Sequence, residues 1–198
     1  GELGVSDVES MREVFRGARI ALFQLESPLD AVAAGLKLAR QVGLTTILDP
    51  APAQPLPPDL MGQVDILTPN ESEALGLLQL PPRRIGIGEA APIAKALLDL
   101  GPRMVILKMG AEGCYSATRE SQTHHAGFTV DAVDTTAAGD TFNAGLAVAL
   151  AEDRDFAEAL RFANAAAAIS VTRAGAQASV PSRAEVETFL KRSLTRKE

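Results

Sequence analysis

The sequence contains few of the residues on which several common classes of protein depend. Of its 198 residues one is cysteine, Cys114, none is tryptophan, and aromatic side chains make up 4%. A single cysteine excludes a disulfide framework within the chain and a zinc site built on cysteines. Acidic residues outnumber basic ones by 25 to 19, for a net charge of −6, which argues against nucleic-acid binding because that requires a basic face.

Long hydrophobic runs are also missing. The longest nearly apolar stretches, such as residues 144–151, are much shorter than the roughly 20 residues that cross a bilayer as a helix. No basic start followed by an apolar stretch resembles a signal peptide. We therefore expect a cytoplasmic protein with no membrane partner. Small phosphate ligands stay open, because backbone amides bind them without net positive charge.

The chain does contain a regular alternation of short apolar runs and longer helical patterns. Four runs predict strands, at residues 20–25, 45–48, 64–67 and 104–107. Three helical patterns lie between them, over residues 28–42, from residue 70 onward, and from Pro92 in a first turn to about Leu100. Such alternation predicts an α/β fold with a doubly wound, mostly parallel sheet and helices on both faces, in one domain over residues 1–198.

The pattern changes in the second half of the chain. Two β-rich segments, 114–118 and 123–130, flank a polar turn, which predicts an antiparallel hairpin added to the parallel sheet. Three helical segments close the chain, over residues 140–151, 155–172 and 182–192.

The strongest candidate site is the run Asp134-Thr135-Thr136-Ala137-Ala138-Gly139-Asp140-Thr141-Phe142, which leads from a β-rich stretch into a helix. Small residues at 137–139 let backbone amides point outward at the helix start, where the aligned peptide dipoles favour an anion. Asp140 then lies in the first turn, where a carboxylate is placed to accept a proton from a hydroxyl that attacks phosphorus. The simpler interpretation makes Asp140 a residue favoured at helix starts and Gly139 part of a turn.

Other candidates lie where strands end, because open parallel sheets bind ligands outside the carboxyl ends of their strands. Glu26, Asp49, Asn70 and Lys108 all occupy such positions. Asn70-Glu71-Ser72-Glu73 also reads as a capping box, in which Asn70 caps the helix, and this interpretation is compatible with a role for Glu73 on hydrated Mg²⁺. Glu26 is also explained as an acidic residue favoured near the start of a helix. The segment 108–113, with two glycines three apart, fits either an ordinary β-turn or a loop approached closely by a ligand.

These motifs together resemble the ribokinase-like (PfkB) carbohydrate kinases. The run Asp134–Phe142, with Asn143-Ala144-Gly145 behind it, is similar to the family signature. Asn70-Glu71-Ser72-Glu73 resembles the family's Asn-x-x-Glu motif, and Gly110-Ala111-Glu112-Gly113 its nucleotide loop. Three further segments are most similar to the members that act on D-ribose: residues 24–26, 50–53 and 171–177.

The resemblance implies an ATP-dependent sugar kinase that phosphorylates the 5-hydroxyl of D-ribose. Asp140 would be the catalytic base, Glu26 would bind the sugar, and Glu73 would act on Mg²⁺. The anion hole would be formed by the amides of Ala137, Ala138 and Gly139. The nucleotide would be bound by Asn70, Lys108, Gly110, Ala111, Glu112, Gly113, Gly139 and Asn164. At the position of Lys108, the family members that act on D-ribose usually have threonine.

The resemblance also implies a potassium ion beside the anion hole and a homodimeric intact enzyme. The ion's ligands would be drawn from Asp134, Thr136, Ser170, Arg173, Gly175 and Ser179. The family's N-terminal segment, which carries a sugar-binding Gly-Gly motif and a small β-sheet lid, has no counterpart in this sequence. We therefore expect the C-terminal, nucleotide-binding two-thirds of a kinase, with the lid missing.

Three other functions stay open. One is a non-catalytic nucleotide-binding module, and the second is a kinase for another sugar of the same family. The third is an NAD-dependent Rossmann oxidoreductase, which shares the sheet but requires a G-x-G-x-x-G after the first strand, and that motif is absent here.

Overall fold

A computed structural model describes residues 3–195 of the chain. It divides into two compact units. The sheet unit comprises Gly1–Met109 and Tyr115–His124, and the helical unit comprises Gly110–Cys114 and His125–Glu198. The sequence did not indicate this division, and the single domain over residues 1–198 stays a prediction.

Six strands form one sheet whose spatial order follows the chain, from β1 to β6. The strands are β1 Ile20–Phe23, β2 Thr45–Leu48, β3 Ile66–Leu67, β4 Met104–Lys108, β5 Cys114–Ala117 and β6 Gln122–His125. β1 to β4 pair in parallel, with Phe23 opposite Leu48 and Leu67 opposite Val105. β5 and β6 are joined by four residues, which only an antiparallel pair allows. The expected α/β class, the mostly parallel sheet and the added hairpin are confirmed.

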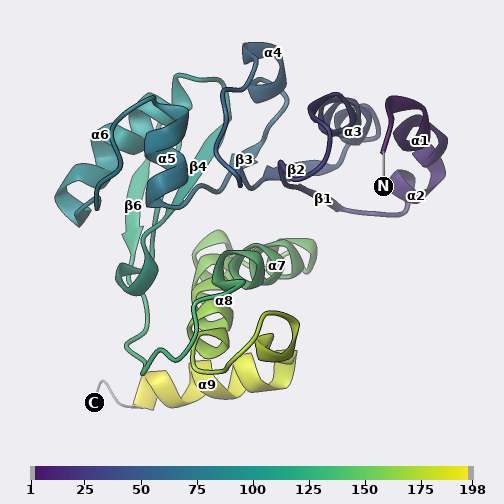
Figure 1. Cartoon of the computed structure of the whole chain (residues 1–198). Helices are drawn as coiled ribbons and strands as arrows, with labels where there is room; N and C mark the ends of the chain where they lie inside the picture. The colour runs from purple at the N-terminus through teal and green to yellow at the C-terminus, as the bar shows by residue number, and fades with distance from the viewer. Residues whose placement is uncertain (1–2, 196–198) are drawn as a thin grey trace. The chain divides into compact units, whose positions relative to one another are not determined.

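Helices fill most of the rest of the chain (Figure 1). They are α1 Val5–Ser10, α2 Arg12–Arg16, α3 Leu29–Gln41, α4 Pro58–Met61, α5 Glu71–Leu77, α6 Ile87–Leu98, α7 Ala138–Ala151, α8 Phe156–Ser170 and α9 Arg183–Thr195, with short 3₁₀ turns η1 Gly110–Glu112 and η2 Gln177–Ser179. Within residues 3–195, no helix combines the length and the hydropathy that a bilayer span requires.

The sequence prediction was wrong about the start of α6. Pro92 lies inside the helix and not in its first turn, because α6 begins five residues earlier, at Ile87. Proline removes only the hydrogen bond to the carbonyl four residues back, at Gly88. Gly88 is exposed, so water can satisfy that carbonyl and the helix tolerates the proline.

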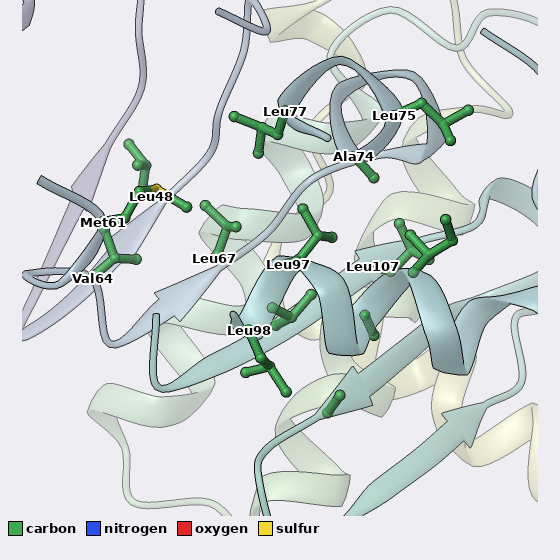
Figure 2. Close-up of a cluster of buried hydrophobic side chains, with 14 of the residues drawn as sticks. Leu48, Met61, Val64, Leu67, Ala74, Leu75, Leu77, Leu97, Leu98 and Leu107 are labelled. Carbon is green, nitrogen blue, oxygen red and sulfur yellow. The ribbon is translucent and has the colours of Figure 1, made fainter. Parts of the chain in front are cut away.

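The core of the sheet unit lies between the strands and the helices α3 to α6. Because the parallel strands advance in one direction, right-handed crossovers place these helices on the same face of the sheet. Figure 2 shows side chains from the strands meeting those of the helices: Leu48, Leu67 and Leu107 meet Met61, Ala74, Leu75, Leu77, Leu97 and Leu98. Each large side chain buried there contributes about 1.5–3 kcal/mol relative to exposure. This packing fixes where the parallel strands end.

In the helical unit, α7 and α8 pack closely through small residues. A Cβ added to Gly145 of α7 would lie 3.2 Å from Cα of Ala163 and 3.3 Å from Cβ of Ala166 in α8. A larger side chain at position 145 would push the two helices apart. α7 thus rests on a closely fitted partner helix.

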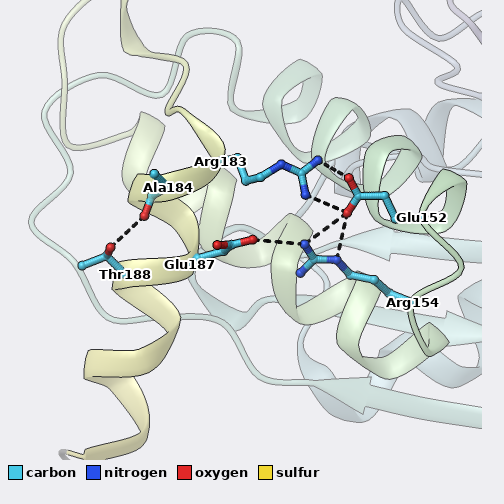
Figure 3. A network of polar contacts seen from close by, with 6 residues as sticks. All are labelled: Glu152, Arg154, Arg183, Ala184, Glu187 and Thr188. Atoms are coloured by element: carbon cyan, nitrogen blue, oxygen red, sulfur yellow. Dashed lines mark hydrogen bonds and ion pairs between the residues drawn. The ribbon is translucent and has the colours of Figure 1, made fainter.

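A cluster of charges ties the end of α7 to α9 (Figure 3). Glu152, just after α7, accepts hydrogen bonds from Arg183 and from Arg154. Arg154 also pairs with Glu187 of α9, with 3.4 Å between nitrogen and oxygen. The hydrogen bond from Arg183 is the main reason that the pKa of Glu152 falls from its usual 4.5 to about 2.

This lowered pKa predicts how stability depends on acid. The folded-state pKa of Glu152 lies below the unfolded-state value, so its stabilisation is complete above pH 4.5 and is lost as the pH falls toward 2. Glu152→Gln is therefore expected to lower the thermal unfolding midpoint near neutral pH, with the difference from wild type shrinking as the pH falls through this window. Melting curves of both proteins between neutral pH and pH 2.5 measure this. A difference that stays constant over the whole range would contradict it.

Candidate functional site

The carboxyl ends of the parallel strands gather several of the predicted residues at one edge of the sheet unit. Asp49 directly follows β2, Lys108 ends β4, and Asn70 follows β3 after two residues. Asn70 and Lys108 pair as an isolated parallel bridge that extends β3 and β4 beyond their regular ends. Glu26 follows β1 at the same edge, where its side chain is exposed. The expected strand-end edge is thus present, with Asn70 and Lys108 side by side.

Asn70 and Glu73 form the expected capping box at the start of α5. The Asn70 Oδ1 accepts a hydrogen bond from the Glu73 amide at 2.9 Å, and Glu73 Oε2 accepts one from the Asn70 amide at 2.7 Å. The Asn70 Nδ2 donates to Glu73 Oε1 at 2.6 Å. Burial raises the pKa of Glu73, while the charge of Lys108 opposes this change. The Glu73 carboxylate is therefore held in one orientation by Asn70, the N-cap residue of α5.

Lys108 does not point freely out of the sheet edge. Its Nζ lies 2.9 Å from Asp49 Oδ2, and the two side chains are only 10% and 6% exposed. Both residues were predicted at strand ends, but the ion pair between them was not predicted. The available signal was two opposite charges at the carboxyl ends of strands that lie two places apart in one sheet.

The signature run forms the start of α7 in the helical unit. Ala137 has φ +58° and ψ +16°, a left-handed conformation that is uncommon for residues other than glycine. The Thr141 amide donates to the Ala137 carbonyl at 2.9 Å, so the amides of residues 138–140 precede the helical ladder. Of these, the Ala138 amide donates to Thr135 at 3.2 Å. Asp140 is exposed in the first turn, beside these amides.

The predicted nucleotide loop lies in the same unit and packs against another stretch of backbone. Gly110 and Gly113 have positive φ, +55° and +88°. A Cβ at Gly113 would lie 2.2 Å from the His125 carbonyl oxygen and 2.4 Å from the Gly127 amide nitrogen. A Cβ at Gly127 would in turn lie 2.5 Å from the Ala111 carbonyl oxygen. This loop requires glycine for contact between backbones, so its shape is fixed.

Asn164 of α8 is a predicted nucleotide contact and is buried. Its Nδ2 donates to Cys114 Sγ at 3.6 Å, next to the glycine loop. Burial raises the pKa of the Cys114 thiol to about 12, and the Asn164 hydrogen bond opposes this only in part. Cys114 is therefore a neutral packing partner at neutral pH, not a nucleophile.

Four of the six residues predicted for potassium lie in two neighbouring loops. The Val133 and Asp134 amides both donate to the Val171 carbonyl, at 2.7 and 3.1 Å. Asp134 accepts hydrogen bonds from the Thr136 and Gly175 amides, both at 2.9 Å. A hydrogen bond from the Thr136 side chain is the main reason that the pKa of Asp134 falls to about 2, and the two amides add to it. The loops 133–136 and 171–175 therefore lie side by side and bring Asp134, Thr136, Arg173 and Gly175 together, and Ser170 ends α8 just before the second loop. Ser179 is buried nearby in sequence, in η2.

One contact beside these loops was missed. Arg173 donates to Glu185 of α9 at 2.5 Å, and Glu185 also accepts from the Ser182 amide at 2.8 Å. The α9 start thus holds the Arg173 side chain. The sequence offered a signal for the cap, since Ser182 and Glu185 are three apart, but none for the partner in the loop.

The oxygen donors at these positions suit the two cations implied by the sequence, K⁺ and Mg²⁺. Carbonyl and carboxylate oxygens of the two loops suit a hard monovalent cation. Within residues 3–195, no group of three or more His, Cys, Asp or Glu side chains is placed to hold a metal ion. Glu73 supplies a single carboxylate, which suits Mg²⁺ because that ion keeps several waters and is bound through one or two carboxylates together with substrate phosphates.

Comparison with known proteins decides the family. The sequence profile described as pfkB family carbohydrate kinase matches residues 5–183. The chain belongs to the pfkB family of carbohydrate kinases. This pfkB family chain is also similar to the ribokinase of Haemophilus influenzae, with 43% identity over 171 residues, 85% of this chain and 55% of the relative.

Solved structures agree with the family. A structure of Arabidopsis thaliana ribokinase complexed with ribose and ATP matches this pfkB family chain with a TM-score of 0.86 and 33% identity, over 92% of this chain and 59% of that one. A structure from E. coli that contains ATP and Mg²⁺ has a TM-score of 0.74 and 25% identity, over 91% of this chain and 61% of that one. The chain therefore has the ribokinase-like α/β fold and spans 55% to 61% of the length of these proteins.

Proposed function

We propose that this chain is the nucleotide-binding part of an ATP-dependent kinase that phosphorylates D-ribose at its 5-hydroxyl. Membership of the pfkB carbohydrate kinase family supports the reaction class. The similarity to ribokinases, including one whose solved structure contains ribose and ATP, supports D-ribose as the sugar.

The observation that carries the proposal is the start of α7. A left-handed turn at Ala137 leads into α7, whose first amides precede the helical ladder, and Asp140 is exposed in the same first turn. A backbone conformation that is unfavourable for alanine is typical of sites where local geometry serves function. Phosphoryl transfer to an alcohol requires a group that stabilises the charge of the transferring phosphoryl and a base that accepts the proton of the hydroxyl. We assign the first role to the amides of residues 137–139 and the second to Asp140.

The proposed step is one displacement at phosphorus. Asp140 accepts the proton of the 5-hydroxyl as that oxygen bonds to the γ-phosphorus of ATP. The bond between the γ-phosphorus and the bridging oxygen breaks, and ADP leaves with that electron pair. The amides at the α7 tip stabilise the charge on the transferring group, and Glu26 hydrogen-bonds the sugar.

The proposed contacts to the nucleotide are Asn70 at the sheet edge, where Lys108 lies beside it, the Gly110-Ala111-Glu112-Gly113 loop, Gly139 and Asn164. Glu73 would hold water molecules of a hydrated Mg²⁺, which when bound neutralises phosphate charge. A cytoplasmic location and a homodimer stay predictions.

The direct test is a phosphorylation assay of the full-length gene product with ATP, Mg²⁺ and a set of sugars. We expect D-ribose to give ribose 5-phosphate and ADP in equal amounts, identified by mass spectrometry and NMR. Faster turnover of 2-deoxyribose or another sugar would keep the kinase and reassign its substrate. ATP binding with no sugar phosphorylated would favour the non-catalytic module instead.

Potassium supplies a second prediction. We expect K⁺ to raise the rate of D-ribose phosphorylation several-fold above Na⁺, and Asp134→Ala to abolish this response. The variant loses the carboxylate that joins loop 133–136 to Gly175. Asp131→Ala, which removes an exposed carboxylate three residues earlier, is the matched control and should respond like wild type. Equal rates in both salts for the wild-type enzyme would contradict the assignment of these loops to potassium.

A further inference from the structure

The pair formed by Lys108 and Asp49 is unusual in its burial. The Lys108 Nζ and Asp49 Oδ2 lie 2.9 Å apart, and both side chains are at least nine-tenths buried. Lysine and aspartate are almost never fully buried unless they are paired, because removing a charge from water costs several kcal/mol per ion in real proteins. An isolated partner would therefore be strongly unfavourable, and each residue depends on the other.

The pair spans a neighbouring strand. Asp49 follows β2 and Lys108 ends β4, and β3 lies between them in the sheet. The Asp49 amide donates to the Phe23 carbonyl at 2.9 Å, which ties this residue to the end of β1 as well. The side-chain bridge thus crosses the end of β3, at the place where the chain leaves the sheet to enter α5.

The backbone of Lys108 holds the residues that follow β3. Its amide donates to the Pro69 carbonyl at 2.8 Å, and it forms the isolated bridge with Asn70. Asn70 in turn holds Glu73 through the capping box, by contacts of 2.6 to 2.9 Å. A continuous set of contacts therefore leads from Asp49 through Lys108 and Asn70 to Glu73.

We propose that Lys108 is a positioning residue for the magnesium–nucleotide edge of the site, acting through its ion pair with Asp49 and not by contacting phosphate. The inference rests on the proposed function, which places Asn70 on the nucleotide and Glu73 on hydrated Mg²⁺. The ammonium of Lys108 pairs with Asp49, and its charge also acts on the neighbouring Glu73. Lys108 therefore affects nucleotide binding through the positions in which it holds Asn70 and Glu73.

The alternative is direct contact, in which Lys108 leaves Asp49 and its ammonium binds a phosphate. The two roles differ in what Asp49 does. For direct contact, Asp49 competes with the nucleotide for Lys108, so Asp49→Asn should preserve or improve the affinity for MgATP. For positioning, Asp49→Asn should weaken it as much as loss of the lysine does.

The experiment is a double-mutant cycle in the full-length gene product with Lys108→Gln, Asp49→Asn and the double variant. Each single variant removes one member of the ion pair and changes the balance of charge around Glu73, and we expect each to raise the KM for MgATP about tenfold. Gln and Asn can hydrogen-bond as a neutral pair, so we expect the double variant to return within about threefold of wild type. The KM for D-ribose should stay unchanged throughout.

Arg103→Gln is the matched control. Arg103 precedes the same strand at its opposite end and pairs with Asp65 at 3.3 Å, but its side chain is 69% exposed. Exposed pairs contribute little, so this variant should keep the wild-type KM for MgATP. Thermal unfolding midpoints of all variants set a temperature at which each is folded.

Positioning and direct contact predict different KM values for MgATP in these variants. An Asp49→Asn variant with unchanged or lower KM for MgATP, or a double variant as impaired as Lys108→Gln, would overturn positioning in favour of direct contact. Lowered unfolding midpoints with an unchanged KM in every variant would reduce the pair to a purely structural role and also overturn it. Failure of the proposed function is seen separately, as a wild-type enzyme that phosphorylates no sugar.

Discussion

Replacing Asp140 by asparagine is expected to lower kcat for D-ribose phosphorylation by roughly 10³-fold, the range of a general base that is lost from its site. Asparagine has nearly the same shape and accepts a hydrogen bond but no proton at neutral pH. The amides at the α7 tip and the glycine loop stay in place, so the KM for ATP should change little. Steady-state kinetics of the full-length gene product, together with calorimetric ATP binding, measure both effects.

The control must distinguish a base from a residue that merely favours a helix start. Glu158 occupies the third helical position of α8, as Asp140 does in α7, and both are acidic side chains in a first turn. Glu158→Gln removes a helix-start charge of the same kind and should leave kcat unchanged. Comparable losses in both variants, or unchanged turnover in Asp140→Asn, would return Asp140 to the helix-start interpretation.

The second large effect is expected at Gly113. Gly113→Ala should destabilise the folded protein by more than about 4 kcal/mol, because backbone atoms of another segment occupy the space. The new Cβ would lie 2.2 Å from the His125 carbonyl oxygen and 2.4 Å from the Gly127 nitrogen, and φ is +88°. Backbone atoms on both sides cannot move aside as a flexible side chain would. The loop must open, and with it the predicted nucleotide site.

Gly110 is the matched control for this substitution. It also has positive φ, +55°, but an added Cβ would meet nothing within 4 Å. Gly110→Ala should therefore cost only about 1–2 kcal/mol, the strain of a left-handed conformation. Urea unfolding followed by circular dichroism compares the two variants. Similar losses in both would mean that conformation alone, and not contact between backbones, requires Gly113.

Much of the fold could be predicted because local patterns coincide with tertiary burial. Residues 45–48 and 104–107 are short apolar runs buried in a parallel sheet, and both strands appear at those positions. α4 has no counterpart among the predicted helices, yet Pro58 occupies its first turn, which needs no amide donor. The short helices α1 and α2 carry few apolar positions and gave no periodic signal.

The candidate site could likewise be predicted only where its residues are close together in sequence. The start of α7 was predicted because its small residues and its aspartate are adjacent in sequence, and the capping box of Asn70 and Glu73 likewise. The ion pair of Lys108 with Asp49 joins residues 59 apart in sequence, and the pair of Arg173 with Glu185 joins two different elements. Such partners follow from strand order and loop placement, which hydrophobic periodicity does not encode.

A crystal structure of the full-length gene product with D-ribose and a non-hydrolysable ATP analogue tests the central claim most directly. We expect the terminal phosphate within hydrogen-bond distance of the amides at the α7 tip and the ribose 5-hydroxyl within reach of the Asp140 carboxylate. A nucleotide bound away from residues 137–139, or an Asp140 side chain that faces neither ligand, would contradict the account.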